Sequence, residues 1–259
     1  MRLRADLHTH TLASGHAYST ATELAVAARR AGLGLIAITD HGPACPGAPE
    51  QWYFWNLKVL PSIIDGVRIL KGCEANPAET DSGLDLPDTI LEQLDFVAVG
   101  FHPETGFDQC DRVRNTEALL RVMANPNVDM ITHPGNDSEF PLDLEAIVAE
   151  AARRSIILEL NDHTFAPTSC RASSSHRERE FAGAAMAAGA PIAVNSDAHF
   201  ASQVGRFEAA LAVAEEIGLA EERIINRTPE AVLEHLLARR PRPRLDHGGI
   251  WDTGAGGTA

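Results

Sequence analysis

The chain has 259 residues, 44% of them hydrophobic, which is enough for one large folded domain. Its 36 acidic residues outnumber its 22 basic residues and give a formal net charge of −14. This charge argues against nucleic acid or an anionic membrane surface as the main partner, whereas it suits a site that holds several cations.

Short apolar runs alternate with amphipathic or alanine-rich stretches along the chain. The runs predict strands over residues 3–7, 35–39, 67–73, 95–101, 128–132, 155–161 and 191–195. The stretches predict helices over residues 20–32, part of 51–66, 86–94, 116–125, 142–154, a segment ending near Gly189, 206–218 and 234–240. Thr20 or Thr22 is the expected cap of the first helix, and Gly32 is its expected end.

The predicted strands are nearly continuous apolar runs, as in parallel strands that are buried on both faces. Strict alternation of strand and helix then favours a parallel sheet with helices outside it. Seven such units are one short of the eightfold α/β barrel. An open, doubly wound sheet has a similar pattern, and periodicity alone does not separate the two.

Polar residues of metal-binding type follow the predicted strands. In chain order they are His8, His10, His16, Asp40, His41, Glu74, His102, His133, Asn161, Asp197 and His199. The carboxyl ends of parallel strands form one face, which is the active face of α/β barrels and of open sheets. The sequence therefore predicts one site at this face.

The spacing of these residues indicates a metal site. His8 and His10 are two positions apart and so project to one face of a strand, and Asp197 and His199 repeat this spacing. Imidazole and carboxylate groups suit zinc, manganese or iron. Seven histidines and two carboxylates are too many for one ion, and Glu74 is the natural carboxylate to bridge two.

The remaining histidines are interpreted as solvated or hydrogen-bonded side chains. They are His163, His176, His235 and His247. Asp40 is predicted to orient a ligand from outside the metal site or to cap a strand end. Arg171, in the loop after the sixth strand, is predicted to bind an anion or to be a surface charge. The chain has no P-loop, no H-E-x-x-H motif and no G-x-S-x-G elbow.

The motifs DLHTHT-x₄-H, ITDHG, GFH, ITHPGN and NSDAH, with a glutamate ending the third strand, resemble the PHP (polymerase and histidinol phosphatase) family. Within it the chain is most similar to the YcdX-type metal-dependent phosphatases, over residues 1–240. The resemblance implies a distorted (β/α)7 TIM-like barrel with three divalent metal ions, of which zinc, manganese or iron are the candidates.

The resemblance also implies which residues hold each ion. His8, His10, Glu74 and Asp197 would hold the first, and His16, His41 and His199 the second. The third would share Glu74 and add His102 and His133. Arg171 would bind the phosphate.

These ligands predict a phosphatase that hydrolyses a small phosphomonoester with a trinuclear metal centre. A histidinol-phosphate phosphatase and a nucleotide phosphodiesterase are alternatives that use the same site, and a non-catalytic metal-binding domain is a third. The sequence names neither the natural substrate, the native metal nor the general acid. It also leaves the oligomeric state open, including a homo-oligomer.

We expect a barrel domain over residues 1–240 and a flexible, glycine-rich tail over residues 241–259. The four cysteines form no C-x-x-C pair, which is typical of a reducing compartment. No signal-peptide pattern and no apolar run of membrane-spanning length is found. The expected location is the cytoplasm.

Overall fold

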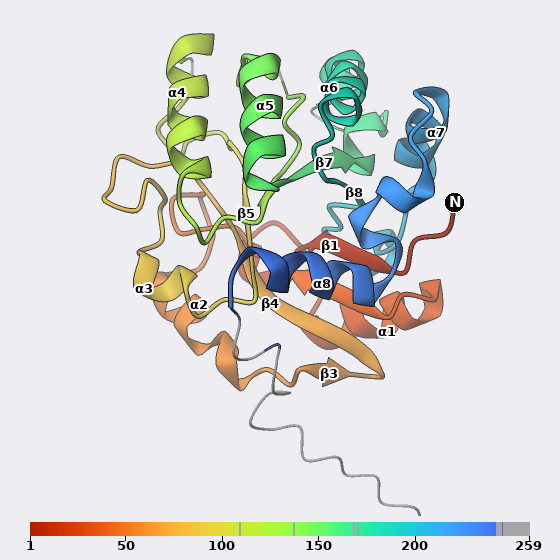
Figure 1. Ribbon diagram of the computed structural model, residues 1–259. Coiled ribbons are helices and arrows are strands. Elements are labelled where there is room, and N and C mark those ends of the chain that lie inside the picture. The colour runs from red at the N-terminus through yellow and green to blue at the C-terminus, as the bar shows by residue number, and fades with distance from the viewer. Residues whose placement is uncertain (109, 137, 168, 170, 242–244, 246–259) are drawn as a thin grey trace, which may run out of the picture.

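A computed structural model describes residues 1–241 and 245, except 109, 137, 168 and 170 (Figure 1). Seven parallel strands form a sheet in the order β1-β2-β4-β5-β6-β7-β8. They are β1 Ala5–Thr9, β2 Leu35–Ile38, β4 Val67–Ala75, β5 Phe96–Val99, β6 Met130–Ile131, β7 Ile157–Asn161 and β8 Ile192–Asn195. The seven predicted strands are therefore confirmed, and they form a nearly closed barrel. The expected tail over 241–259 lies outside the described residues, apart from residues 241 and 245.

One short strand, β3 (Ile63–Ile64), was not predicted. It pairs antiparallel with β4 through a tight turn at Asp65 and Gly66, whose φ angles are 50° and 78°. An Asp-Gly pair between apolar residues is a strong signal for a two-residue hairpin turn. The expectation of a partly helical segment over 51–66 is met by the helix Gln51–Asn56, and β3 lies in the remainder.

The helices cover the outside of the barrel (Figure 1). They are α1 Ala21–Ala31, α2 Gln51–Asn56, α3 Asp88–Leu91, α4 Arg112–Met123, α5 Leu144–Arg154, α6 Ser175–Ala188, α7 Glu208–Glu216 and α8 Pro229–Arg239. Thr20, rather than Thr22, caps α1 and forms a reciprocal capping box with Glu23. Gly32 ends this helix in the left-handed region, as predicted. Within the described residues, no helix combines the length and apolar character needed to cross a membrane.

Two apolar layers hold the barrel together. The inner layer fills its interior and consists of Ala5, Leu7, Leu35, Ala37, Leu70, Phe96, Ala98, Met130, Ile157 and Ala193, with Val232 and Leu236 from α8. Arg239 and Arg240, at the end of α8, donate to the carbonyl oxygens of Val128 and Leu94, which lie before strands β6 and β5. Helix α8 therefore closes the amino-terminal end of the barrel and leaves the carboxyl-terminal end for the site.

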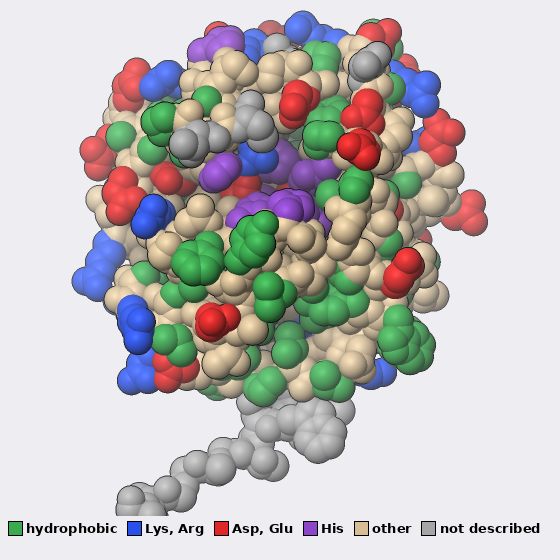
Figure 2. Space-filling model, turned by 180° about the vertical axis from the view of Figure 1, so that it is seen from behind, with side chains coloured by type: hydrophobic (Ala, Val, Ile, Leu, Met, Phe, Trp, Pro, Cys, Tyr) green, Lys and Arg blue, Asp and Glu red, His purple; other side chains and the backbone are tan. Residues whose placement is uncertain are grey.

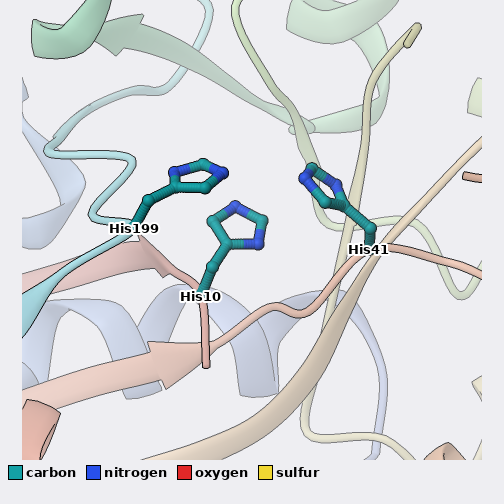
Figure 3. Close-up of side chains that lie close together, drawn as sticks. All are labelled: His10, His41 and His199. Carbon is teal, nitrogen blue, oxygen red and sulfur yellow. The ribbon is translucent and has the colours of Figure 1, made fainter. Parts of the chain in front are cut away.

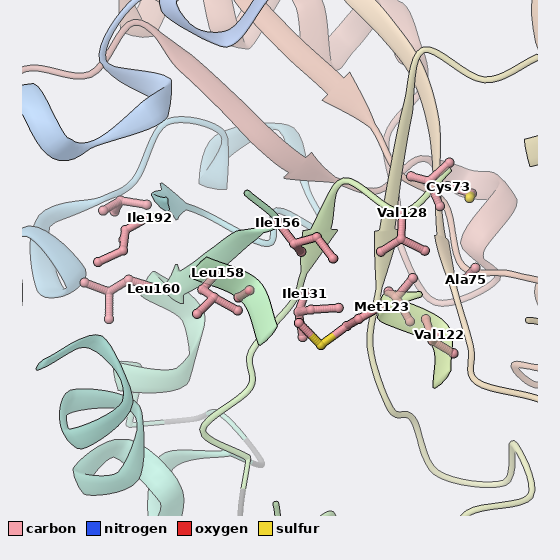
Figure 4. Packing of buried hydrophobic residues seen from close by; sticks show 14 of the residues in the cluster. Cys73, Ala75, Val122, Met123, Val128, Ile131, Ile156, Leu158, Leu160 and Ile192 are labelled. Carbon is pink, nitrogen blue, oxygen red and sulfur yellow. The ribbon is translucent and has the colours of Figure 1, made fainter. Parts of the chain in front are cut away.

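The outer layer packs the strands against the surrounding helices. Figure 4 shows part of it, where Ile131 of β6 lies beside Met123 of α4 and Leu160 of β7 lies beside Ile192 of β8. Each fully buried aliphatic side chain of this kind stabilises the fold by about 1.5–3 kcal/mol. The barrel is thus held by apolar burial on both faces of its strands.

The seam between the first and last strands, β1 and β8, combines an isolated backbone bridge between Thr9 and Ala198 with hydrogen bonds from buried side chains. The amide nitrogen of Asn226 donates to the carbonyl oxygens of Ala5 and Val194 at 2.8 and 2.6 Å, and its oxygen accepts from the Val194 N–H. The Asn195 side chain accepts from the Leu7 N–H at 2.9 Å. These buried amides stand in for most of a regular ladder, so the barrel closes in a distorted way.

Candidate metal centre

Nine of the predicted residues converge at the carboxyl-terminal end of the barrel. They are His8, His10, His16, His41, Glu74, His102, His133, Asp197 and His199. Histidine side chains gather in a hollow on this face of the molecule (Figure 2). Positions far apart in the sequence therefore contribute to one site, as the strand-end pattern predicts.

Glu74 lies at the centre of this group and is fully buried. Its Oε2 atom lies 2.9 Å from Nδ1 of His41 and 3.3 Å from Nε2 of both His8 and His102. Its Oε1 atom lies 3.0 Å from Nε2 of His133. The two oxygens of one carboxylate thus face different imidazoles, which is the arrangement that a bridging ligand needs.

Asp197 is the second carboxylate of the centre. Its Oδ1 atom lies 3.3 Å from Nε2 of His10, 3.4 Å from Nε2 of His8 and 3.5 Å from Nδ1 of His199. Its Oδ2 atom accepts a hydrogen bond from Arg171, whose side chain is largely buried. Arg171 therefore lies beside the centre rather than on the outer surface.

His10, His41 and His199 come from three separate segments, and their rings lie side by side (Figure 3). The ring of His10 lies 4.3 Å from that of His41 and 4.4 Å from that of His199, measured between centroids. His16 is exposed, and its Nε2 atom lies 3.2 Å from Nε2 of His41. His16 thus joins the group from the solvent side.

Three groups of potential ligand atoms are compact enough to hold an ion. They are His8–His10–Asp197, His10–His41–His199 and His41–Glu74–His102, with the ligand atoms of each within 4.8 Å of one another. The first group matches three of the four ligands expected for the first ion. His10 and His41 each belong to two groups, so the geometry does not reproduce the expected division of the other ligands.

Several buried atoms that point into the centre form no hydrogen bond within the described part of the chain. They are Nε2 of His8, His10 and His102, Nδ1 of His41 and Oε2 of Glu74. Buried polar atoms rarely lack a partner, and the binding of an ion at the site is one of the accepted reasons. Imidazole nitrogen and carboxylate oxygen are ligands for zinc, manganese and iron, so the residues fit divalent metal ions.

The charges of the centre favour ionised carboxylates. Burial opposes ionisation of Glu74, but His8 and His102 hold the pKa of its carboxyl group well below the usual value. Burial likewise opposes ionisation of Asp197, and His8 and Arg171 lower its pKa. Metal ligands must be deprotonated, so these two carboxylates are in the form that binds a cation.

Two of the candidate ligands have unusual backbone geometry. His133 and Asp197 have φ angles of 30° and 53°, although neither is glycine. Such conformations cost on the order of 1–3 kcal/mol each and are concentrated at functional sites. Here both follow the end of a strand, so the chain turns sharply where a side chain must enter the centre.

Glu159, in the middle of β7, is a residue that the sequence analysis missed. It is buried, and its Oε1 atom lies 2.7 Å from Nδ1 of His8. Its Oε2 atom accepts from the backbone N–H of His133 at 2.8 Å and from the Asn161 side chain at 2.9 Å. The sequence signal that could have identified Glu159 is the alternation of side chains along β7. This alternation puts position 159 on the same face as Asn161, inside the barrel.

Other hydrogen bonds fix further imidazoles from outside the centre. Nδ1 of His102 lies 2.7 Å from the Asn76 side-chain oxygen, and Asn76 in turn donates to Asp85. Hydrogen bonds of this kind set which ring nitrogen faces a metal. The orientation of the His102 ring is therefore fixed by Asn76, in the loop that follows β4.

Asp40 lies outside the centre, although it is adjacent in sequence to His41. It accepts hydrogen bonds from the Ser14 hydroxyl at 2.7 Å and the Tyr53 hydroxyl at 2.6 Å, and from the Thr11 N–H and hydroxyl. The Ser14 hydroxyl also lies 3.0 Å from Nδ1 of His10. Asp40 is thus connected to the ring of His10 indirectly, by hydrogen bonds that pass through the Ser14 hydroxyl.

His163, which the sequence analysis interpreted as a solvated or hydrogen-bonded side chain, lies close to the candidate ligands. It lies in the 3₁₀ turn η3 (Asp162–Phe165), and its ring centroid is 6.4 Å from that of His199. The side chain is partly buried, and burial lowers its pKa. His163 is therefore at the edge of the centre.

Replacing Glu159 by glutamine is expected to lower metal affinity and kcat/KM by about 10- to 100-fold. One oxygen would become an amide NH₂ group facing groups that already donate hydrogen bonds, so His8 or the loop of His133 must shift. Metal titration and steady-state kinetics measure the effect. Glu150→Gln is the matched control, because Glu150 pairs with Arg153 and Arg154 on α5. Equal behaviour of the two variants would contradict this role for Glu159.

The chain is similar to known proteins over most of its length. The family model of the PHP domain matches residues 6–163. A probable phosphatase of Caldanaerobacter subterraneus subsp. tengcongensis is 44% identical over 242 residues, which cover 93% of this chain and 94% of that protein. A probable phosphatase of Shewanella oneidensis is 42% identical over 239 residues, with coverage of 92% and 93%.

A solved structure has a similar fold. It is the histidinol phosphate phosphatase of Lactococcus lactis, complexed with zinc, L-histidinol and phosphate. The match has a TM-score of 0.61 at 17% identity and covers 85% of this chain and 95% of that chain. At this identity the likeness shows the shared barrel fold.

Proposed function

The chain belongs to the PHP family of phosphoesterases, and from this premise we propose that it is a phosphatase that hydrolyses a small phosphomonoester with a trinuclear metal centre. The observation that carries the proposal is the set of buried ligand atoms that point into one hollow and have no hydrogen bond to any described residue. Bound divalent ions would neutralise charge on the phosphate and lower the pKa of a water molecule towards neutrality.

The proposed ligands follow the division implied by the family resemblance. They are His8, His10, Glu74 and Asp197 for one ion, His16, His41 and His199 for a second, and Glu74, His102 and His133 for the third. The compact group His8–His10–Asp197 supports the first set. The two oxygens of Glu74, each facing different rings, support its place in two sets. Zinc is the preferred candidate, and manganese or iron also suits these ligands.

Two further residues have proposed roles beside the metals. The guanidinium group of Arg171, held by Asp197 at the edge of the centre, would bind an oxygen of the phosphate. Asp40 would keep the ring of His10 in place through the Ser14 hydroxyl. Neither role needs a covalent intermediate on a side chain.

Turnover of p-nitrophenyl phosphate and bis-p-nitrophenyl phosphate tests the proposal with protein loaded with zinc or manganese. We expect about three ions per chain and faster hydrolysis of the monoester. Faster hydrolysis of the diester would indicate a phosphodiesterase, and metal binding without turnover would indicate a non-catalytic domain. Histidinol phosphate is the third substrate, and a marked preference for it over other alkyl phosphates would identify a histidinol-phosphate phosphatase.

A further inference from the structure

Among the described ligands, those on the side of His16 and His199 are the most exposed to solvent. The side chains of Glu74 and Asp197 are 0% and 2% exposed, whereas that of His199 is 24% exposed and His16 lies at the surface. If the proposed function holds, the phosphate binds among the buried ligands. The organic group of the ester must then project outwards, past His199.

His163 lies beside this opening on a turn that is fixed from two directions. The Asn161 side-chain oxygen accepts from the Thr164 N–H at 3.1 Å, which ties the turn to the end of β7. Asp162 accepts from the Ala210 N–H at 2.9 Å, which ties it to α7. The ring of His163 is therefore held 6.4 Å from that of His199 rather than placed on a loose loop.

The ring of His163 also differs from those of the ligand histidines in its hydrogen bonds. Nδ1 of His8, His10 and His102 each lies within hydrogen-bond distance of a protein side chain. Across the described ranges, neither ring nitrogen of His163 has a hydrogen-bond partner. A partly buried imidazole with an open N–H is available to a bound molecule.

We propose that His163 donates a hydrogen bond from its ring N–H to the ester oxygen, the oxygen that leaves with the organic group. This inference rests on the proposed function and adds a catalytic residue to it. In the reaction the oxygen of water bonds to phosphorus, and the bond between phosphorus and the ester oxygen breaks. The leaving oxygen keeps the electron pair and takes a proton from the solvent at the opening. The attacking water molecule releases a proton to the same solvent. The imidazole is unchanged at the end.

A donor at this position matters most when the leaving oxygen holds its negative charge poorly. The test therefore compares phenyl phosphate with p-nitrophenyl phosphate, whose nitro group spreads that charge. For His163→Ala we expect kcat/KM to fall by about 100-fold with phenyl phosphate and by less than about 10-fold with p-nitrophenyl phosphate. His163→Gln keeps an N–H donor and should recover part of the loss.

His235→Ala is the matched control, because His235 lies on α8 at the opposite end of the barrel and contacts the Ser155 carbonyl oxygen. It should change neither rate. Metal content is measured for every variant, and His163→Ala should keep all the ions of the wild type. Equal losses with the two esters, no loss with either, or loss of metal would overturn the role of His163. Metal-loaded wild-type protein that hydrolyses neither ester would overturn the proposed function as well.

Discussion

Glutamine at position 74 is expected to lower kcat/KM by about a thousandfold or more and to release at least one metal ion. The substitution keeps the size of the side chain but removes its negative charge and one of its oxygens. In the structure Oε2 of Glu74 faces the inward nitrogens of His8, His41 and His102, and an amide NH₂ group there would not bind a cation. The measurements are metal content and steady-state kinetics of the purified variant.

His133→Ala is the comparison that makes this result specific. His133 faces only the Oε1 side of Glu74, at 3.0 Å, and belongs to one proposed ion. It should lose less metal and less activity than Glu74→Gln. Both variants should show a wild-type circular dichroism spectrum, because apolar layers hold the barrel. Glu74→Gln protein that keeps three ions and a near wild-type rate would show that Glu74 is not a bridge.

Complete removal of metal by a chelator should abolish phosphatase activity, and added zinc or manganese should restore it. The proposed function assigns the attack on phosphorus to a metal-activated water molecule rather than to a side chain of the described residues. Cys73 is fully buried, and burial raises the pKa of the Cys45 thiol to about 11. The Ser14 hydroxyl is held by Asp40. In the proposed mechanism the nucleophile is a water molecule activated by the bound ions, so activity should depend on them.

The chelation experiment needs two controls. Circular dichroism before and after metal removal checks that the fold persists, and re-addition of metal checks that the loss is reversible. Residual activity with no detectable metal would rule out the metal-dependent mechanism. Activity that magnesium alone restores would contradict the preference of imidazole ligands for zinc, manganese or iron.

The sequence predicted the strands well, because both faces of these strands are buried and their apolar runs are nearly unbroken. It did not separate a barrel from an open sheet, since closure depends on single polar side chains such as Asn226 and Asn195, which carry no periodic signal. β3 was missed because a two-residue strand is too short to show alternation. Its Asp-Gly turn was the local signal that was available.

For the site, position at a strand end was a reliable guide because parallel strands share one carboxyl-terminal face. The same guide overlooked Glu159, which lies within a strand and points into the barrel. It also did not place His163 beside the centre, because the location of this residue depends on how the turn after β7 packs against α7. Residues that act from inside a strand or from a packed turn need the three-dimensional structure to be found.

The side-chain seam has a consequence for how the protein folds. The hydrogen bond between the Leu7 N–H and Asn195 joins positions 188 residues apart, and that between Asp6 and the Ser196 N–H joins positions 190 apart. Contacts at such separations form slowly, because a long loop of chain must be closed first. A growing polypeptide that ends before residue 191 already contains seven of the nine candidate ligands, and β1 can pair with β2, but the other edge of β1 still lacks β8. The active conformation is therefore completed only when the two ends of the barrel sequence meet, which makes closure of the ring the last step in building the centre.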